Sequence, residues 1–259
     1  MEQTLLVETT DGIARLTLNR PEAFNAFDLE TMDPFGASLL SLAKDPGVAG
    51  VVITGAGRAF SAGGDLRWLS GHGKGPAEAF PTLAASFHKA VLEIRSMPKP
   101  VVAAVNGLAA GGGFSLALAC DFRVMAASAV LRQGYTTNGL SPDGGCTYTL
   151  PRLTGIPRAV EILTFDPPIS AEKALSWGLV NEVVEEGKVI ARAVEMIERI
   201  RQGSLTSFAA IKTLINEAFQ GPLERVLERE RELLACCADH PNGREGVAAF
   251  LEKRKPVYR

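Results

Sequence analysis

Short apolar runs alternate with longer stretches of helical spacing along the first half of the chain. Two β-like runs, 4–9 and 13–19, flank the turn-forming pair Asp11-Gly12 and predict a hairpin. Apolar residues at helical spacing predict helices at 29–43 and 80–96. The other β-like runs of this half are 48–54, 101–105, 121–126 and 129–131. Strands that alternate with helices indicate parallel pairing through helical crossovers.

From residue 144 onward the pattern becomes mostly helical. One apolar run, 179–184, interrupts it and predicts a strand, whereas the polar, glycine-rich stretch 70–75 predicts a surface loop earlier in the chain. The stretches that predict helices are 144–153, 157–165, 171–177, 189–201, 207–219, 223–238 and 243–251. Because no change in composition marks a second domain, we expect an α/β core over 1–195 and a helical region over 196–259.

The composition is typical of a soluble globular protein. Hydrophobic residues make up 46% of the 259 residues and charged residues 22%, with a formal net charge of −2. This balance argues against nucleic acid or a membrane surface as a partner, since both are usually bound through a basic surface. The longest apolar candidate for a membrane span, 101–120, is interrupted by Asn106 and four glycines.

The cysteines and histidines show no ligand spacing. The four cysteines lack a CxxC pair and the three histidines are scattered, so we expect reduced thiols and no metal. No basic and apolar leader is visible at the N-terminus, which favours a cytoplasmic location.

Glycine turns carry the first candidate chemistry. Gly111-Gly112-Gly113 lies between a β-like run and a small-residue helical run, where bare backbone N–H groups at a helix start can bind an anionic oxygen. Gly63-Gly64 also follows a β-like run, 50–54. Two such turns can direct one N–H each at one oxygen, which is the requirement of an oxyanion hole. Close packing alone is the alternative; a dinucleotide site fits poorly, because Leu116 stands where GxGxxG needs glycine.

Six motifs follow one another along nearly the whole chain. They are 18–21 with 25–26, 60–66, 99–107 leading into 111–113, 139–145, 171–181 and 253–256. Through them the chain resembles the crotonase (enoyl-CoA hydratase/isomerase) superfamily. The motif Pro142-Asp143-Gly144-Gly145 is similar to that of its isomerase-like and dehalogenase-like branches, which have an aspartate at this position.

The resemblance implies a fold, an assembly and a substrate class. The fold is α/β, a crotonase-like spiral of repeated ββα units with a helical C-terminal trimerisation region, which implies a homotrimer or a dimer of trimers. The substrate is an acyl-CoA thioester, so coenzyme A enters with the substrate and no separate cofactor is expected. The thioester oxygen would lie between the backbone N–H groups of Gly64 and Gly112.

The same resemblance suggests residues that bind coenzyme A. Backbone contacts to its adenine would come from the segment with Ala62, Gly64, Asp65 and Leu66, and from the nearby Ala23 and Phe24. Basic residues usually meet the phosphates, for which Lys212, Lys253 and Arg254 are candidates; a solvated charged surface is the alternative for each.

Two positions bear on the reaction. Where the family's hydratases carry two glutamates that activate water, this chain has Ser115 and Tyr135. A two-carboxylate hydration mechanism is therefore unsupported. Asp143 is the remaining candidate, with a helix N-cap as its structural alternative. His88 and Tyr135 fall near a histidine and an aromatic residue of the dehalogenase branch; the alternatives are a partly exposed helix residue for His88 and a pocket-wall or core aromatic for Tyr135.

The leading hypothesis is a Δ3,Δ2-enoyl-CoA isomerase in which Asp143 carries the proton, because one carboxylate can take a proton from C2 and return it at C4. Three alternatives stay open. Asp143 could be the nucleophile of a dehalogenase or hydrolase; another group could position water for hydration; or the chain could bind acyl-CoA without catalysis. An aromatic residue at 135 favours aromatic, cyclic or other unsaturated acyl groups.

Overall fold

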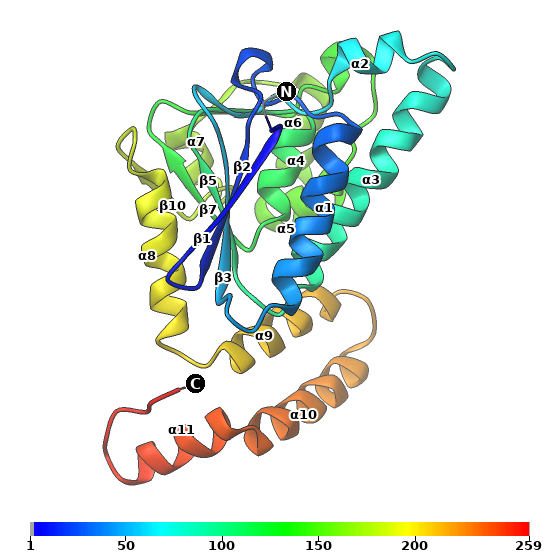
Figure 1. The fold of residues 1–259 in the computed structure, drawn as a ribbon. Helices are drawn as coiled ribbons and strands as arrows, with labels where there is room; N and C mark the ends of the chain where they lie inside the picture. The colour runs from blue at the N-terminus through cyan, green and yellow to red at the C-terminus, as the bar shows by residue number, and fades with distance from the viewer. Residues whose placement is uncertain (1–2, 259) are drawn as a thin grey trace.

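The structure, a computed structural model, describes residues 3–258 and contains two β-sheets covered by helices (Figure 1). The chain begins with an antiparallel hairpin of β1 (Leu5–Thr10) and β2 (Ile13–Leu18). Its two turn residues have positive φ, 51° at Asp11 and 78° at Gly12, as the twist of a tight hairpin requires. The predicted hairpin is confirmed.

The larger sheet forms the centre of the protein. Its order is β1-β2-β3-β5-β7-β10, and each pair from β2 onward is parallel. The added strands are β3 (Gly50–Gly55), β5 (Val101–Val105), β7 (Phe122–Ala126) and β10 (Glu182–Val184). Every residue of β3 and β5 is buried, which explains their unbroken apolar sequence.

The remaining strands form a smaller sheet of order β4-β6-β8-β9. Its strands are β4 (Ala59–Ser61), β6 (Leu108–Ala110), β8 (Val130–Arg132) and β9 (Ile169–Ser170). A strand of the small sheet follows each of β3, β5 and β7 within a few residues, and a helix comes next. The chain therefore repeats a ββα unit three times, which confirms the predicted architecture.

Helices cover the sheets and extend beyond them. The central ones are α1 (Leu29–Lys44), α2 (Leu66–Gly71), α3 (Pro76–Ser96), α4 (Gly112–Ala119), α5 (Cys146–Thr154), α6 (Ile156–Phe165), α7 (Ala171–Ser176) and α8 (Val189–Arg201). The last three are α9 (Leu205–Glu217), α10 (Leu223–Asp239) and α11 (Pro241–Leu251). Two 3₁₀ turns, Pro21–Ala23 and Thr136–Asn138, complete the elements.

The C-terminal helices leave apolar side chains in solvent. α10 and α11 contact each other and lie beneath the rest of the chain, with α9 between (Figure 1). Large apolar residues on them are more than half exposed: Leu223, Leu227, Leu234, Val247, Phe250 and Leu251. Such a surface suits the oligomerisation predicted for 196–259, which stays a prediction. The predicted boundary after residue 195 falls inside α8, and α8 packs against the large sheet.

Local predictions differ from the structure where elements are short. The strand predicted at 179–184 includes only 182–184, and the loop predicted at 70–75 begins inside α2. α3 starts at Pro76, ahead of the predicted 80, since proline is tolerated in a first helical turn. No described helix is long and apolar enough to cross a membrane.

A buried ion pair joins α9 to the core. Lys212 Nζ lies 2.7 Å from Asp121 Oδ2 and donates to the Lys99 carbonyl, while the same carboxylate accepts the Val101 N–H. Lys212 is only 6% exposed. The structure therefore assigns Lys212 to this ion pair, so its suggested contact with a coenzyme A phosphate is wrong for this conformation.

We predict that Lys212→Met lowers the free energy of unfolding by about 3–5 kcal/mol, because it leaves the Asp121 carboxylate buried without its counter-charge. Urea denaturation followed by circular dichroism measures the change. Lys188→Met is the control, since the exposed pair of Lys188 with Glu185 contributes less than about 1 kcal/mol. Equal destabilisation by the two substitutions would contradict the prediction.

Candidate active site

An apolar cavity of about 400 Å³ opens where the strands of the small sheet end. β4 and β6 are parallel neighbours, and so are β6 and β8, so the turns after these strands meet at one edge. Those turns supply the cavity with Gly64, Gly112 and Tyr135. The apolar wall consists mainly of Phe27, Leu66, Leu69, Phe80, Leu83, Phe87 and Leu140.

The backbone N–H of Gly64 has no acceptor among the described residues, although the N–H groups on either side of it are hydrogen-bonded. The Ala62 N–H donates to the Phe24 carbonyl at 2.9 Å, and the Asp65 N–H donates to the Phe27 carbonyl at 2.8 Å. Between them, the Gly63 N–H bonds Ser61 Oγ at 3.1 Å. Only the Gly64 N–H of this segment has no acceptor among the described residues. It is available to a ligand.

The Gly112 N–H is the second free donor. α4 begins at this residue, so its N–H has no partner inside the helix. The preceding Gly111 N–H donates to the Arg132 carbonyl, which ties the turn to β8. A Cβ atom on Gly63 would lie only 2.5 Å from the Gly112 nitrogen, so the two glycine turns touch. The predicted pair of donors therefore comes together at the cavity.

Asp143 lines the same cavity and does not cap a helix. α5 begins at Cys146 with Gly145 as its N-cap and no capping side chain, so the N-cap interpretation of Asp143 is excluded. Asp143 Oδ1 lies 2.5 Å from Nε2 of His88 on α3, which is hydrogen-bond distance between the carboxyl group and the imidazole. Of the described residues that line the cavity, Asp143 is the only carboxylate.

Ser115 and Tyr135 hold the main chain of Asp143. Ser115 is fully buried on α4, and its hydroxyl donates to the Asp143 carbonyl at 2.7 Å. The Tyr135 hydroxyl lies 3.2 Å from Ser115 Oγ and donates to it, since the serine proton is already engaged. Burial raises the pKa of Tyr135, so its hydroxyl stays neutral. Sequence motifs gave no sign of this role.

The residues suggested for adenine recognition lie on two neighbouring segments, which are joined by the bond from the Ala62 N–H to the Phe24 carbonyl. Ala62 and Leu66 line the cavity beside Gly64. Ala23 ends a 3₁₀ turn, and Phe24 follows it with a left-handed φ of 52° and the Arg58 guanidinium 4.1 Å from its ring centroid. Their contact with coenzyme A stays a prediction.

The Asp65 side chain is engaged in bonds within the protein. Its Oδ1 accepts the N–H groups of Arg67 and Trp68 at the start of α2, and its Oδ2 pairs with Arg20. Although burial opposes ionisation, these bonds hold the pKa of Asp65 below its ordinary value. Arg254, just after α11, likewise pairs with Glu245 and Glu252, and neither Arg254 nor Lys253 lines the cavity.

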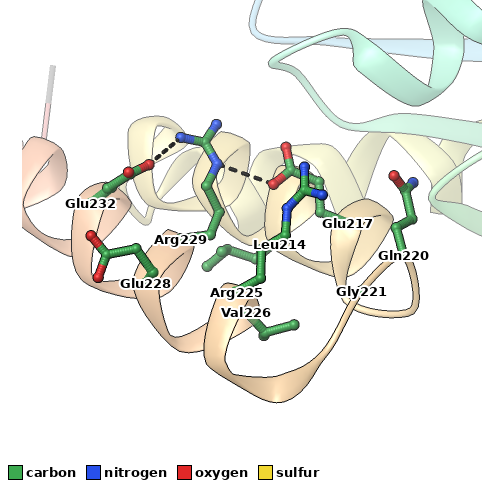
Figure 2. A pocket seen from close by; sticks show the side chains of 9 residues that line it. All are labelled: Leu214, Glu217, Gln220, Gly221, Arg225, Val226, Glu228, Arg229 and Glu232. Atoms are coloured by element: carbon green, nitrogen blue, oxygen red, sulfur yellow. Dashed lines mark hydrogen bonds and ion pairs between the residues drawn. The ribbon is translucent and has the colours of Figure 1, made fainter.

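A second hollow, of about 440 Å³, lies between α9 and α10 (Figure 2). Arg229 crosses it and pairs with Glu217 at 3.0 Å and with Glu232 at 2.9 Å. None of its lining residues lines the apolar cavity. Across residues 3–258 no group of His, Cys, Asp or Glu is placed to hold a metal ion.

The family model described as Enoyl-CoA hydratase/isomerase matches residues 8–259. The chain belongs to the enoyl-CoA hydratase/isomerase family. It is 35% identical to the 1,2-epoxyphenylacetyl-CoA isomerase of Escherichia coli K12, over 100% of this chain and 99% of that one. It is 34% identical to the crotonyl-CoA hydratase of Syntrophomonas wolfei, over 98% and 96%.

A solved structure shows the same fold. The enoyl-CoA hydratase from Polaromonas sp. JS666 superposes with a TM-score of 0.93 at 40% identity, covering 98% of this chain and 99% of that one. The crotonase fold is therefore confirmed. The relatives include both hydratases and isomerases, so family membership alone leaves the reaction open.

Gly113→Ala tests the contact between the two glycine turns of this crotonase-fold site. Its Cβ would lie 2.2 Å from the Ser61 carbonyl oxygen, so the backbone must move. We expect a loss of roughly 1–3 kcal/mol in unfolding free energy together with weaker binding of an acyl-CoA in calorimetry. Gly36→Ala on α1 is the control, because no atom lies within 4 Å of the added carbon. Unchanged acyl-CoA affinity in Gly113→Ala would contradict the prediction.

Proposed function

We propose that this enzyme moves the double bond of a 3-enoyl-CoA to the 2-position, with Asp143 as the proton carrier. One observation supports this choice over hydration. Asp143 is the only carboxylate among the described residues of a cavity that also contains the two free N–H groups of Gly64 and Gly112.

The chemistry needs a place for negative charge. When Asp143 takes a proton from C2, the electrons move toward the thioester oxygen and an enolate forms. Donors already aimed at this oxygen stabilise it without reorganising, and loss of one such donor typically costs about 3–4 kcal/mol. Return of the same proton from Asp143 to C4 moves the double bond and regenerates the carboxylate.

The surroundings of Asp143 fit a proton carrier. His88 holds the carboxylate and Ser115 holds the carbonyl of the same residue, so the side chain has a fixed position at the cavity. Hydration by the two-carboxylate route would require acids at 115 and 135, where this site has neutral hydroxyls. Isomerisation needs only the one carboxylate.

The apolar wall suits an unsaturated acyl group, including aromatic and cyclic ones. Phe27 and Phe87 are buried and lie 5.0 Å apart between ring centroids. Tyr135 adds a third ring to the lining. The relative from Escherichia coli, named for an epoxide of phenylacetyl-CoA, supports the proposal that the cavity accepts a ring.

We further propose that the chain acts in the cytoplasm as a trimer or a dimer of trimers, with coenzyme A brought by the substrate.

Asp143→Asn is expected to lower turnover of a 3-enoyl-CoA by roughly 10²–10⁴-fold, because the amide cannot accept the proton from C2. The KM should change little, since the N–H donors remain. Formation of the conjugated 2-enoyl thioester, followed by its ultraviolet absorption, measures the rate. Asp239→Asn on the exposed end of α10 is the matched control.

Full isomerase activity in Asp143→Asn would exclude the proposal. Two other results would favour the alternatives. Incorporation of solvent oxygen into the Asp143 carboxylate during turnover would identify a nucleophile, and tight binding of acyl-CoA without turnover of any enoyl or aryl thioester would identify a binding protein.

Tyr135→Phe tests whether the tyrosine is a titrating group. Because its pKa is raised, the phenol stays protonated up to pH 10, and its removal should leave the alkaline limb of the pH–rate profile unchanged. Loss of one hydrogen bond of about 1 kcal/mol should slow turnover by roughly fivefold. Disappearance of an alkaline limb in this variant would contradict the prediction.

A further inference from the structure

Arg20 connects the two segments that together present the Gly64 N–H. One terminal nitrogen of its guanidinium donates to the Ala26 carbonyl at 2.9 Å and to Asp28 Oδ2 at 3.0 Å. The other donates to Asp65 Oδ2 at 2.9 Å. The planar guanidinium presents its donors in fixed, diverging directions, which suits acceptors on two different segments.

Both aspartates that bind Arg20 also cap a helix. Asp28 Oδ1 accepts the Thr31 N–H and caps α1, and Asp65 Oδ1 caps α2. Each aspartate thus uses one oxygen for a helix start and the other for Arg20. Through Arg20, the starts of two helices that are 37 residues apart in sequence become parts of one network, since α1 begins at Leu29 and α2 at Leu66.

The donor Gly64 lies inside this network. Besides the bond from the Ala62 N–H to the Phe24 carbonyl, the two segments pair through an isolated parallel bridge between Phe27 and Gly64. Its two hydrogen bonds are Phe27 N–H to the Gly63 carbonyl and Asp65 N–H to the Phe27 carbonyl. Such a short pairing is weak by itself. Arg20 bonds to the residues immediately around it, on both segments.

Charge gives Arg20 a second effect at the same place. Asp65 directly follows Gly64, and Asp28 follows Phe27 on the paired segment. Without a cation, two carboxylates would lie near the oxygen on which negative charge develops, and a like charge raises the energy of an anion. Arg20 offsets both carboxylates while it holds the segments in register.

We infer that Arg20 is a positioning residue of the oxyanion site, which keeps the Gly64 N–H aimed at the thioester oxygen and screens that oxygen from Asp28 and Asp65. The inference rests on the proposed function, in that Gly64 is taken as a donor to the thioester. It adds a specific role for a side chain that does not line the cavity.

The test compares catalysis with carbonyl polarisation in Arg20→Gln. The probe is a saturated acyl-CoA with a ¹³C-labelled thioester carbonyl, whose stretching frequency falls when hydrogen bonds polarise it. We expect kcat to fall by roughly 10–100-fold with KM within about threefold, and the frequency shift of the bound probe to shrink. Arg20→Lys should restore part of both. Arg231→Gln, at a 75% exposed side chain on α10, is the control.

A second variant covers the case in which Arg20→Gln fails to fold. Asp65→Asn keeps a capping oxygen for α2 but breaks the charged link to Arg20, so it should produce a smaller loss of both kcat and frequency shift. A folded variant with reduced kcat and the full wild-type frequency shift would overturn the positioning role of Arg20 and leave the oxyanion site itself unaffected. Absence of any shift in the wild-type protein would overturn the oxyanion site itself.

Discussion

The contact between two glycine turns is the constraint on which the rest of the site depends. Gly63 and Gly112 approach so closely that a side-chain carbon on Gly63 would collide with the Gly112 nitrogen. Gly113 is equally restricted, by the Ser61 carbonyl at the end of β4. Side-chain bulk is therefore impossible at these positions, and backbone N–H groups are the polar atoms that the two turns present to the cavity. Neither donor can be removed by changing a side chain.

The order of strands in the small sheet explains why these turns meet. β4, β6 and β8 are adjacent and parallel although more than 40 residues separate the first from the second. Each passage of the ββα spiral adds a strand to both sheets, and the strand of the small sheet always ends at the same edge. The first two passages supply the glycine donors, and the third supplies Tyr135. The spiral thus gathers residues from distant parts of the chain at one cavity.

The sequence predicted what local pattern encodes. The hairpin, the long helices, the glycine turns and Asp143 could all be recognised because they depend on neighbouring residues or on ordered motifs. β4, β6 and β9 were missed, since two or three residues are too few to show alternation. These side-chain contacts could not be predicted from the sequence, because Arg20 meets Asp65 and His88 meets Asp143 only after the chain has folded.

The hydroxyls of Ser115 and Tyr135 help to determine the conformation of the loop that carries Asp143. The Asp143 carbonyl needs a donor, and the buried Ser115 hydroxyl supplies it. A glutamate at 115 would replace this donor by an ionised acceptor facing a carbonyl oxygen, in a site where Gly144 already packs against Phe87. The loop that holds Asp143 could not keep this conformation. A second carboxylate at this site would therefore require a different loop as well as a different side chain, which supports the proposal that Asp143 acts alone.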